Sequence, residues 1–152
     1  MSTNQTHGSG PLILGTHEKA AGEPVATGSC TLVQTATVAV GTEAVGAVTK
    51  KFRLPAGSQL INMIVVVTTV WDSATTAVLK LTNAAGDIVS AIDVKTAAGV
   101  FDIEDATVNL ARFLAPAASA DTTLNLVWEE TGATASAGAA SVQLHYVQGT
   151  GL

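Results

Sequence analysis

The sequence has little charge, few aromatic side chains and almost no cysteine. Of its 152 residues, 12% are charged and 4% are aromatic, and Cys30 is the only cysteine. The charged share is about half of that in an ordinary domain, which is typical of surfaces covered in an assembly. One cysteine can form no disulfide within the chain, and it offers neither a zinc spacing nor a redox pair. Stability must therefore come from a hydrophobic core, which a chain of this length can build.

Positive charge and long apolar runs are also scarce. The net charge is −5, whereas a nucleic-acid-binding module needs a basic footprint. The longest unbroken apolar run, Met63 to Val67, is far shorter than the ~20 residues of a membrane-spanning helix. The first ten residues have neither a basic start nor an apolar core, so we expect no secretory signal. The composition therefore predicts neither a nucleic-acid partner nor a membrane partner.

Motifs of catalysis and of cofactor binding are missing as well. The histidines are His7, His17 and His145. They are too scattered to suggest a metal site, and no glycine-rich phosphate loop precedes a helix. A triad of Ser73 or Ser141 with His145 and Asp72 can be written, but no G-x-S-x-G elbow supports it. We therefore expect a non-enzymatic protein with no catalytic residue, no cofactor and no metal.

Two groups of residues leave alternatives open. Asp102, Glu104 and Asp105 could offer oxygens to Ca²⁺, but their spacing does not match an EF-hand, and a solvated loop or an ion pair with a neighbouring chain is favoured. Trp71 and Trp128 could line a sugar site. Each stands at the end of an apolar alternation, so packing in the core or at its rim is favoured.

The residues that are present alternate in the pattern of β-strands. Runs rich in β-branched residues are separated by turn signals, and no convincing amphipathic helix occurs. The predicted strands are 30–40, 47–54, 59–71, 76–82, 88–94, 100–103, 107–113, 122–130 and 141–148. This pattern predicts an all-β fold: a single antiparallel β-sandwich or jelly roll of about eight or nine strands.

The run 59–71 is the most hydrophobic part of the sequence. Both of its faces are apolar in the middle, with Ile61, Met63 and Val65 on one face and Ile64 and Val66 on the other. This pattern predicts a central strand that is covered on both sides. The short polar break after it predicts a hairpin that returns through 76–82.

The N-terminal residues differ from the rest. Residues 1–28 are rich in Gly, Ser, Thr and Pro, so we divide the chain into an extended N-terminal arm, 1–28, and a β-sandwich domain, 29–152. Leu12, Ile13 and Leu14 form an apolar patch within the arm. A free tail gains little from three adjacent aliphatics, whereas an arm laid over a partner can bury them. The alternative is a disordered tail.

A basic cluster precedes the central run. It consists of Lys50, Lys51 and Arg53. The simple interpretation is a solvated strand edge, and the alternative is a contact with an anionic surface of a neighbouring subunit. With Leu12, Ile13 and Leu14, these residues are the candidate partner-binding side chains.

One stretch carries a family resemblance. It contains the turn Leu54-Pro55-Ala56-Gly57, the aliphatic run Ile61 to Val67, the group Thr68-Thr69-Val70-Trp71-Asp72 and the segment Ala74-Thr75-Thr76. These features resemble small β-sandwich proteins of tailed bacteriophage heads, in which glycine often stands at the position of Ala74. The resemblance covers about a fifth of the chain and includes no catalytic residue.

The resemblance implies a virion protein: a capsid cement, or decoration, protein with a jelly-roll body. Such proteins are usually homotrimers bound to the outside of the shell, so the implied partners are the major capsid protein and further copies of the chain. Synthesis would take place in the host cytoplasm. The alternative is a head-fibre, tail or receptor-binding β-module that binds a host glycan or protein through an exposed Trp71 or Trp128.

Overall fold

The computed structural model describes residues 29–41, 45, 48–115 and 120–149. The predicted arm, with Leu12, Ile13 and Leu14, lies outside these residues. The strands are β1 (Ser29–Ala39), β2 (Val48–Leu54), β3 (Ser58–Thr69), β4 (Thr76–Asn83), β5 (Gly86–Asp93), β6 (Gly99–Phe101), β7 (Thr122–Thr131) and β8 (Ala139–Gly149). Two short helical turns, η1 (Ile103–Asp105) and α1 (Leu110–Phe113), lie between β6 and β7.

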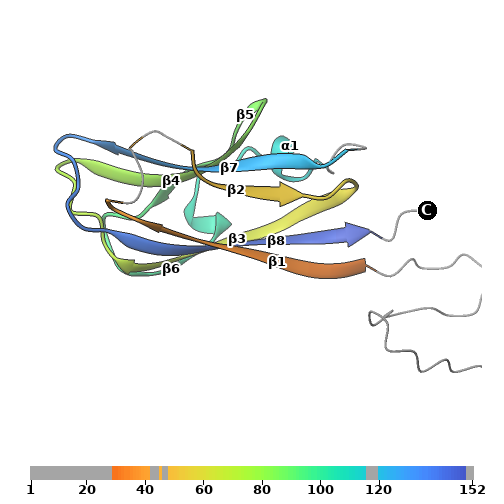
Figure 1. The fold of residues 1–152 in the computed structure, drawn as a ribbon, viewed down its shortest axis with the longest axis horizontal. Helices are drawn as coiled ribbons and strands as arrows, with labels where there is room; N and C mark the ends of the chain where they lie inside the picture. The colour runs from red at the N-terminus through yellow and green to blue at the C-terminus, as the bar shows by residue number, and fades with distance from the viewer. Residues whose placement is uncertain (1–28, 42–44, 46–47, 116–119, 150–152) are drawn as a thin grey trace, which may run out of the picture.

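The strands form two antiparallel sheets that pack face to face (Figure 1). The order is β1-β8-β3-β6 in one sheet and β2-β7-β4-β5 in the other. The first strand pairs with the eighth, the second with the seventh, the third with the sixth and the fourth with the fifth. The chain is thus one long hairpin that has rolled up, with β8 also pairing with β3 and β7 with β4. This arrangement is a jelly roll, which confirms the predicted fold class.

The core lies between the inner faces of the two sheets, where alternate residues of each long strand meet. The largest fully buried side chains are Trp71, Trp128, Phe113, Met63, Leu79, Leu81, Ile88, Ile92, Leu124, Leu126, Leu144 and Val38. The rings of Trp71 and Trp128 have centroids 6.0 Å apart and planes tilted by 57°, an arrangement that aromatic pairs favour. Gly138 lies against the Trp71 ring so closely that a Cβ there would be 2.4 Å from it.

The central strand differs from the prediction in two ways. Its inner face carries Leu60, Met63 and Val65, because the register of β3 against β8 shifts between Leu60 and Asn62. Such a bulge moves the later side chains to the opposite face, so the predicted grouping of Ile61 with Met63 is wrong. The outer face is not covered either: Ile61 is 42% exposed, and Ile64 is half-buried.

The predicted hairpin between 59–71 and 76–82 is also wrong. β3 and β4 lie in different sheets, and the residues between them cross from one sheet to the other. The turn at Leu54-Pro55-Ala56-Gly57 does occur. Ser58 donates its backbone N–H to the Pro55 carbonyl at 3.1 Å, and Gly57 has a φ of 71°. The next hairpin joins β4 and β5, and in it Asn83 pairs with Gly86.

The predicted strand 107–113 is the third correction. Val108 forms a single bridge with Val89 of β5, and the chain then turns into α1. The Asn109 side chain accepts a hydrogen bond from the Arg112 backbone N–H and caps this turn, and Leu, Ala and Arg favour helix.

No helix in the described part of the chain is long and apolar enough to cross a membrane.

Candidate interaction surface

The outer side of the sheet β1-β8-β3-β6 contains no charged side chain. None of its four strands contains Asp, Glu, Lys or Arg. We call this side of the sheet the uncharged face. Its outward side chains are Thr31, Val33, Thr35 and Thr37 on β1, Ser141, Gln143, His145 and Val147 on β8, Gln59, Ile61, Asn62, Ile64, Val66 and Thr68 on β3, and Val100 on β6.

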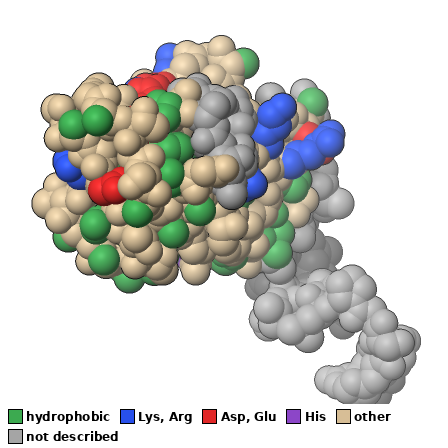
Figure 2. All heavy atoms as spheres, turned by 60° about the vertical axis from the view of Figure 1, so that its left-hand side comes forward, with side chains coloured by type: hydrophobic (Ala, Val, Ile, Leu, Met, Phe, Trp, Pro, Cys, Tyr) green, Lys and Arg blue, Asp and Glu red, His purple; other side chains and the backbone are tan. Residues whose placement is uncertain are grey.

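The pairing register aligns these side chains in rows across the sheet. Thr37, Ser141, Val66 and Val100 form one row. Val100 is 68% exposed, and Val33, in another row, is 50% exposed. In Figure 2 the lowermost part of the molecule, on the side of this sheet, shows hydrophobic and neutral polar atoms without acidic or basic side chains. Within the described part of the chain, the face therefore exposes weakly polar side chains and is rich in β-branched residues.

The outer side of the opposite sheet carries most of the basic cluster. Lys51 and Arg53 are exposed on β2, and the Arg53 Nε donates to Asp121 Oδ2 at 3.0 Å. Lys50 is half-buried and lies on the same side of β2 as the core residue Phe52. The structure therefore splits the cluster between two sides of its strand.

A glutamine joins the two sheets beside this cluster. The Gln34 side chain donates to the Arg53 carbonyl at 2.6 Å and accepts from the Arg53 backbone N–H at 3.2 Å. The Gln34 amide therefore pairs with the backbone N–H and carbonyl of one residue at the edge of β2, as a neighbouring strand would. Because Ser29 pairs with Gly149, and Gln148 pairs with Ser58, the described chain begins at the same end of the sandwich as the β2–β3 turn that follows Arg53.

At the other end, a carboxylate holds two crossing connections together. Asp72 lies between β3 and β4, and Ser136 and Ala137 lie between β7 and β8. Oδ1 of Asp72 accepts from the backbone N–H groups of Ser136 at 2.6 Å and Ala137 at 2.9 Å, and Oδ2 accepts from Ser136 Oγ at 2.6 Å. The hydrogen bond from the Ser136 side chain, with those from the two backbone groups, lowers the pKa of Asp72 to about 2. We call this group the Asp72 clamp.

The structure does not bring the possible triad together. Ser73 is 1% exposed, and its Oγ donates to the Thr76 carbonyl at 2.9 Å. Asp72 belongs to the clamp, and His145 lies on the uncharged face between Val33 and Asn62. Ser73, Asp72 and His145 therefore lie at separate sites and do not form a hydrogen-bonded triad in the structure.

The acidic group acts as a cap. Asp102 accepts from the Glu104 backbone N–H at 2.8 Å, and Asp105 accepts from the Asp102 backbone N–H at 3.1 Å, so the two form a capping box around η1. Among the described residues, no three side chains of His, Cys, Asp or Glu gather as metal ligands. The hydrogen bonds give Asp102 and Asp105 a structural role at this turn.

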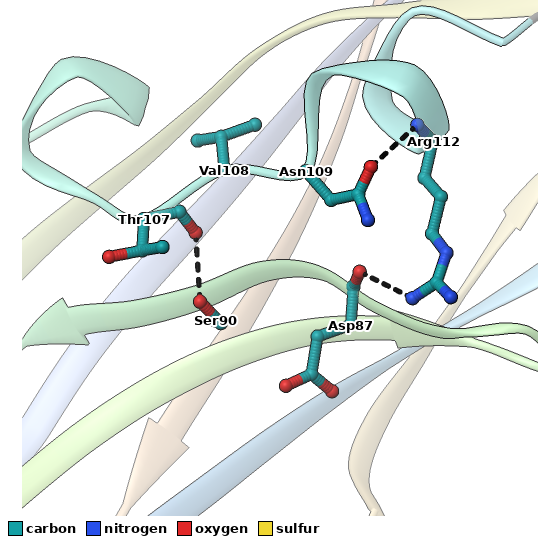
Figure 3. A pocket seen from close by; sticks show the side chains of 6 residues that line it. All are labelled: Asp87, Ser90, Thr107, Val108, Asn109 and Arg112. Carbon is teal, nitrogen blue, oxygen red and sulfur yellow. Dashed lines mark hydrogen bonds between the residues drawn. The ribbon is translucent and has the colours of Figure 1, made fainter.

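A shallow pocket of about 360 Å³ lies beside α1 (Figure 3). Its lining consists of Asp87, Ser90, Thr107, Val108, Asn109 and Arg112. The Arg112 guanidinium donates to the Asp87 carbonyl at 2.9 Å, and Ser90 Oγ donates to the Thr107 carbonyl at 3.0 Å. These hydrogen bonds attach the segment around α1 to β5. The polar groups named here are thus already paired within the chain, which indicates a structural role.

The two tryptophans offer no exposed aromatic surface. Trp71 and Trp128 are each 1% exposed. The alternative, in which one of them is exposed and lines a glycan site, is therefore wrong, and the favoured interpretation of packing in the core is confirmed.

Neither protein-family models nor curated proteins match this sequence. Among solved structures, a chain from the cyanophage Pam1 capsid asymmetric unit has the same fold, with a TM-score of 0.57 and 16% sequence identity. The likeness covers 91% of this chain and 99% of that chain. At this identity the likeness shows a shared fold with a chain of that capsid unit.

Proposed function

We propose that the chain is a non-enzymatic structural protein of a phage particle, and that it serves as a cement protein on the outer surface of the head. The observation that carries the proposal is the likeness to a chain of the Pam1 capsid unit, which spans 99% of that chain. The resemblance of the stretch from Phe52 to Asn83 to small phage-head proteins points in the same direction. The particle would be assembled from protein made in the host cytoplasm.

The mechanism of a cement protein is physical. A copy that straddles a junction between capsid subunits buries surface on each of them, so expansion or rupture of the shell must first break those contacts. Such contacts need no reacting group, which agrees with the structural roles of Asp72, Ser73 and Asp102. The partners would be the major capsid protein and further copies of this chain in a homotrimer.

The capsid contact would involve the arm and the basic cluster. Leu12, Ile13 and Leu14 supply the apolar part, and Lys51 and Arg53 are exposed near the end of the sandwich from which the arm starts. The exposed cations would face an acidic surface of the shell, where steering by charge speeds association. Lys50 is half-buried and would contribute less.

The first test is electron microscopy of the particles of the phage that encodes this chain. Density of the sandwich spread over the outside of the head supports a cement protein. Density confined to the tail or to fibres contradicts it and favours the receptor-binding alternative.

The second test removes residues 1–28 and measures sedimentation of the protein with heads that lack it. We expect the shortened protein to fold, because β1 begins at Ser29, and to lose binding to the heads. A milder variant with Leu12→Ser, Ile13→Ser and Leu14→Ser should weaken binding as well. Undiminished binding of both variants would exclude the arm as the capsid contact.

A further inference from the structure

We propose that copies of this chain associate with one another through the uncharged face. Association in threes rests on the proposed function, whereas the choice of surface rests on the structure alone. Three such faces can close around a threefold axis, where each sheet meets both of its neighbours, as in any closed cyclic assembly.

The first argument is the cost of removing charge from water. An ionised side chain that is buried without a partner loses its hydration and destabilises a complex strongly. The four strands of this sheet contain no such side chain. The four strands of the other sheet contain eight, namely Lys50, Lys51, Arg53, Lys80, Asp87, Asp93, Glu129 and Glu130. The uncharged face can therefore be covered at a much lower electrostatic cost.

The second argument is the gain from covering apolar groups. Val33, Ile61 and Val100 are exposed by 50%, 42% and 68%, and Ile64 and Val66 are half-exposed between them. Burying apolar surface contributes roughly 25 cal/mol per Å². The threonine, glutamine and asparagine side chains among them can exchange hydrogen bonds with water for hydrogen bonds with a neighbour.

The third argument is size. β1, β3 and β8 contain 11, 12 and 11 residues. With a rise of about 3.3 Å per residue and a strand spacing of about 4.8 Å, the face measures roughly 600 Å² in projection. A stable interface takes about 800 Å² of accessible surface from each partner, and a corrugated face exposes more area than its projection. Because each sheet meets two neighbours around a threefold axis, this area is divided over two contacts, which together are comparable in size to one such interface.

The fourth argument identifies the occupant. A charged partner surface would lose its hydration against this face and gain no ion pair, so the partner must be uncharged as well. Within the described chain, the sheet that offers such a surface is this one, and every copy carries it. A second copy of the chain fits this requirement.

The test measures the mass of the purified full chain by light scattering, without any capsid protein. We expect the wild-type protein to have a mass about three times that of the 15.3 kDa chain. The double variant Thr35→Lys, Val100→Lys places two cations on the uncharged face and should dissociate to the monomer. The control, Thr123→Lys, makes the threonine-to-lysine change at an exposed strand position on the other sheet and should keep the wild-type mass. The single variant Thr35→Lys, which it matches directly, should lower the mass.

Three results would overturn the proposal: a monomeric wild-type protein, a folded double variant with the wild-type mass, or a control that dissociates equally. A photo-cross-linking residue at position 35 covers the case in which the double variant does not fold. It should form a covalent bond between two copies of the otherwise wild-type chain, whereas the same residue at position 123 should not, and the reverse pattern contradicts the proposal.

An oligomeric double variant that fails to bind heads would show that the uncharged face contacts the shell and not another copy. Loss of head binding by an arm variant that stays oligomeric bears on the proposed function and leaves this inference intact.

Discussion

The two sheets of the sandwich share one core but differ in their outer sides. The sheet β2-β7-β4-β5 carries eight charged residues in its strands, and β1-β8-β3-β6 carries none. Charged side chains keep a sheet face solvated and discourage contact between chains. The charged sheet is therefore suited to face water, and the uncharged one is suited to be covered.

This difference also explains the unusual composition. A low charged share of 12% is not spread evenly over the surface. The strands of one sheet contain no charged residue, whereas the strands of the other contain a share of charged residues that is ordinary for a soluble protein. The division between the sheets agrees with the proposal that one sheet is covered by a neighbour while the other faces water. The following predictions test whether the sheets form one folding unit and whether they respond differently to pH and salt.

The largest effect is expected at the place where the two sheets share their core. Trp71 follows β3 of one sheet and packs on Trp128 of β7 in the other. Trp71→Ala should lower the free energy of unfolding by about 3–5 kcal/mol, because it leaves a large cavity. Urea unfolding at a fixed protein concentration should show one transition in both proteins. Trp71→Phe, which keeps a ring, should lose less. Two separate transitions would show that the sheets unfold independently.

The second effect concerns the Asp72 clamp, which joins the connections that cross between the sheets. Its pKa of about 2 lies below the ordinary value of 3.8. A depressed pKa adds stability that is present above pH 3.8 and is lost as the pH falls through about 2. Asp72→Asn should therefore lower the Tm at pH 5, and the two Tm curves should converge near pH 2.

Ser136→Ala is the companion variant for the clamp. It removes the Ser136 side-chain hydrogen bond, the largest cause of the lowered pKa, and keeps the backbone hydrogen bonds. The Tm of this variant should depend less on pH than that of the wild-type protein. Parallel Tm curves for Asp72→Asn and wild type over this range would contradict the role of the carboxylate.

A smaller effect is expected where the sheets meet at the edges of β1 and β2. Gln34→Ala removes both hydrogen bonds to the Arg53 backbone. At about 0.5–1.5 kcal/mol for a hydrogen bond, and with solvent access at this site, the loss should be close to 1 kcal/mol. Gln59→Ala, at an exposed position of β3, should change stability much less. Chemical denaturation of the two variants makes the comparison, and equal losses would exclude a bridging role for Gln34.

Much of the fold could be predicted from alternation, because each strand faces a core on one side. Eight of the nine predicted strands occur. The missing one, 107–113, is replaced by the short helical turn that Asn109 caps. The order of strands could not be predicted. The bulge near Ile61 and the crossing between β3 and β4 depend on pairings with β8 and β7, which are distant in sequence.

The uncharged face shows the same limit. Each of its four strands lacks charge in the sequence, but these strands are the first, third, sixth and eighth. Only the pairing of distant segments places them in one sheet. The lack of charge could therefore be seen strand by strand in the sequence, but the uncharged face could not be predicted from it. The basic cluster shows the opposite case: its division between the two sides of β2 follows from local strand alternation, which places Lys50 with Phe52 on one side and Lys51 with Arg53 on the other. Local patterns thus identified elements, and long-range pairing decided which surfaces they build.

The smallest effect separates the two sheets by their response to salt. Lys80 Nζ lies 2.6 Å from Glu129 Oε2 and 4.0 Å from Asp87 Oδ2 on the charged sheet, and the hydrogen bond to Glu129 raises the pKa of Lys80. This pairing adds stability that is present below pH 10.5 and lost as the pH rises above it. Lys80→Met should cost about 0–1 kcal/mol at low salt, as partly exposed ion pairs do, and less at high salt, where ions screen the pair. Thr35→Val on the uncharged face should change stability by an amount that does not depend on salt. Urea unfolding of both variants at two salt concentrations makes the comparison. An equal salt dependence in the two variants would contradict a contribution of the Lys80–Glu129 ion pair to the stability of the charged sheet.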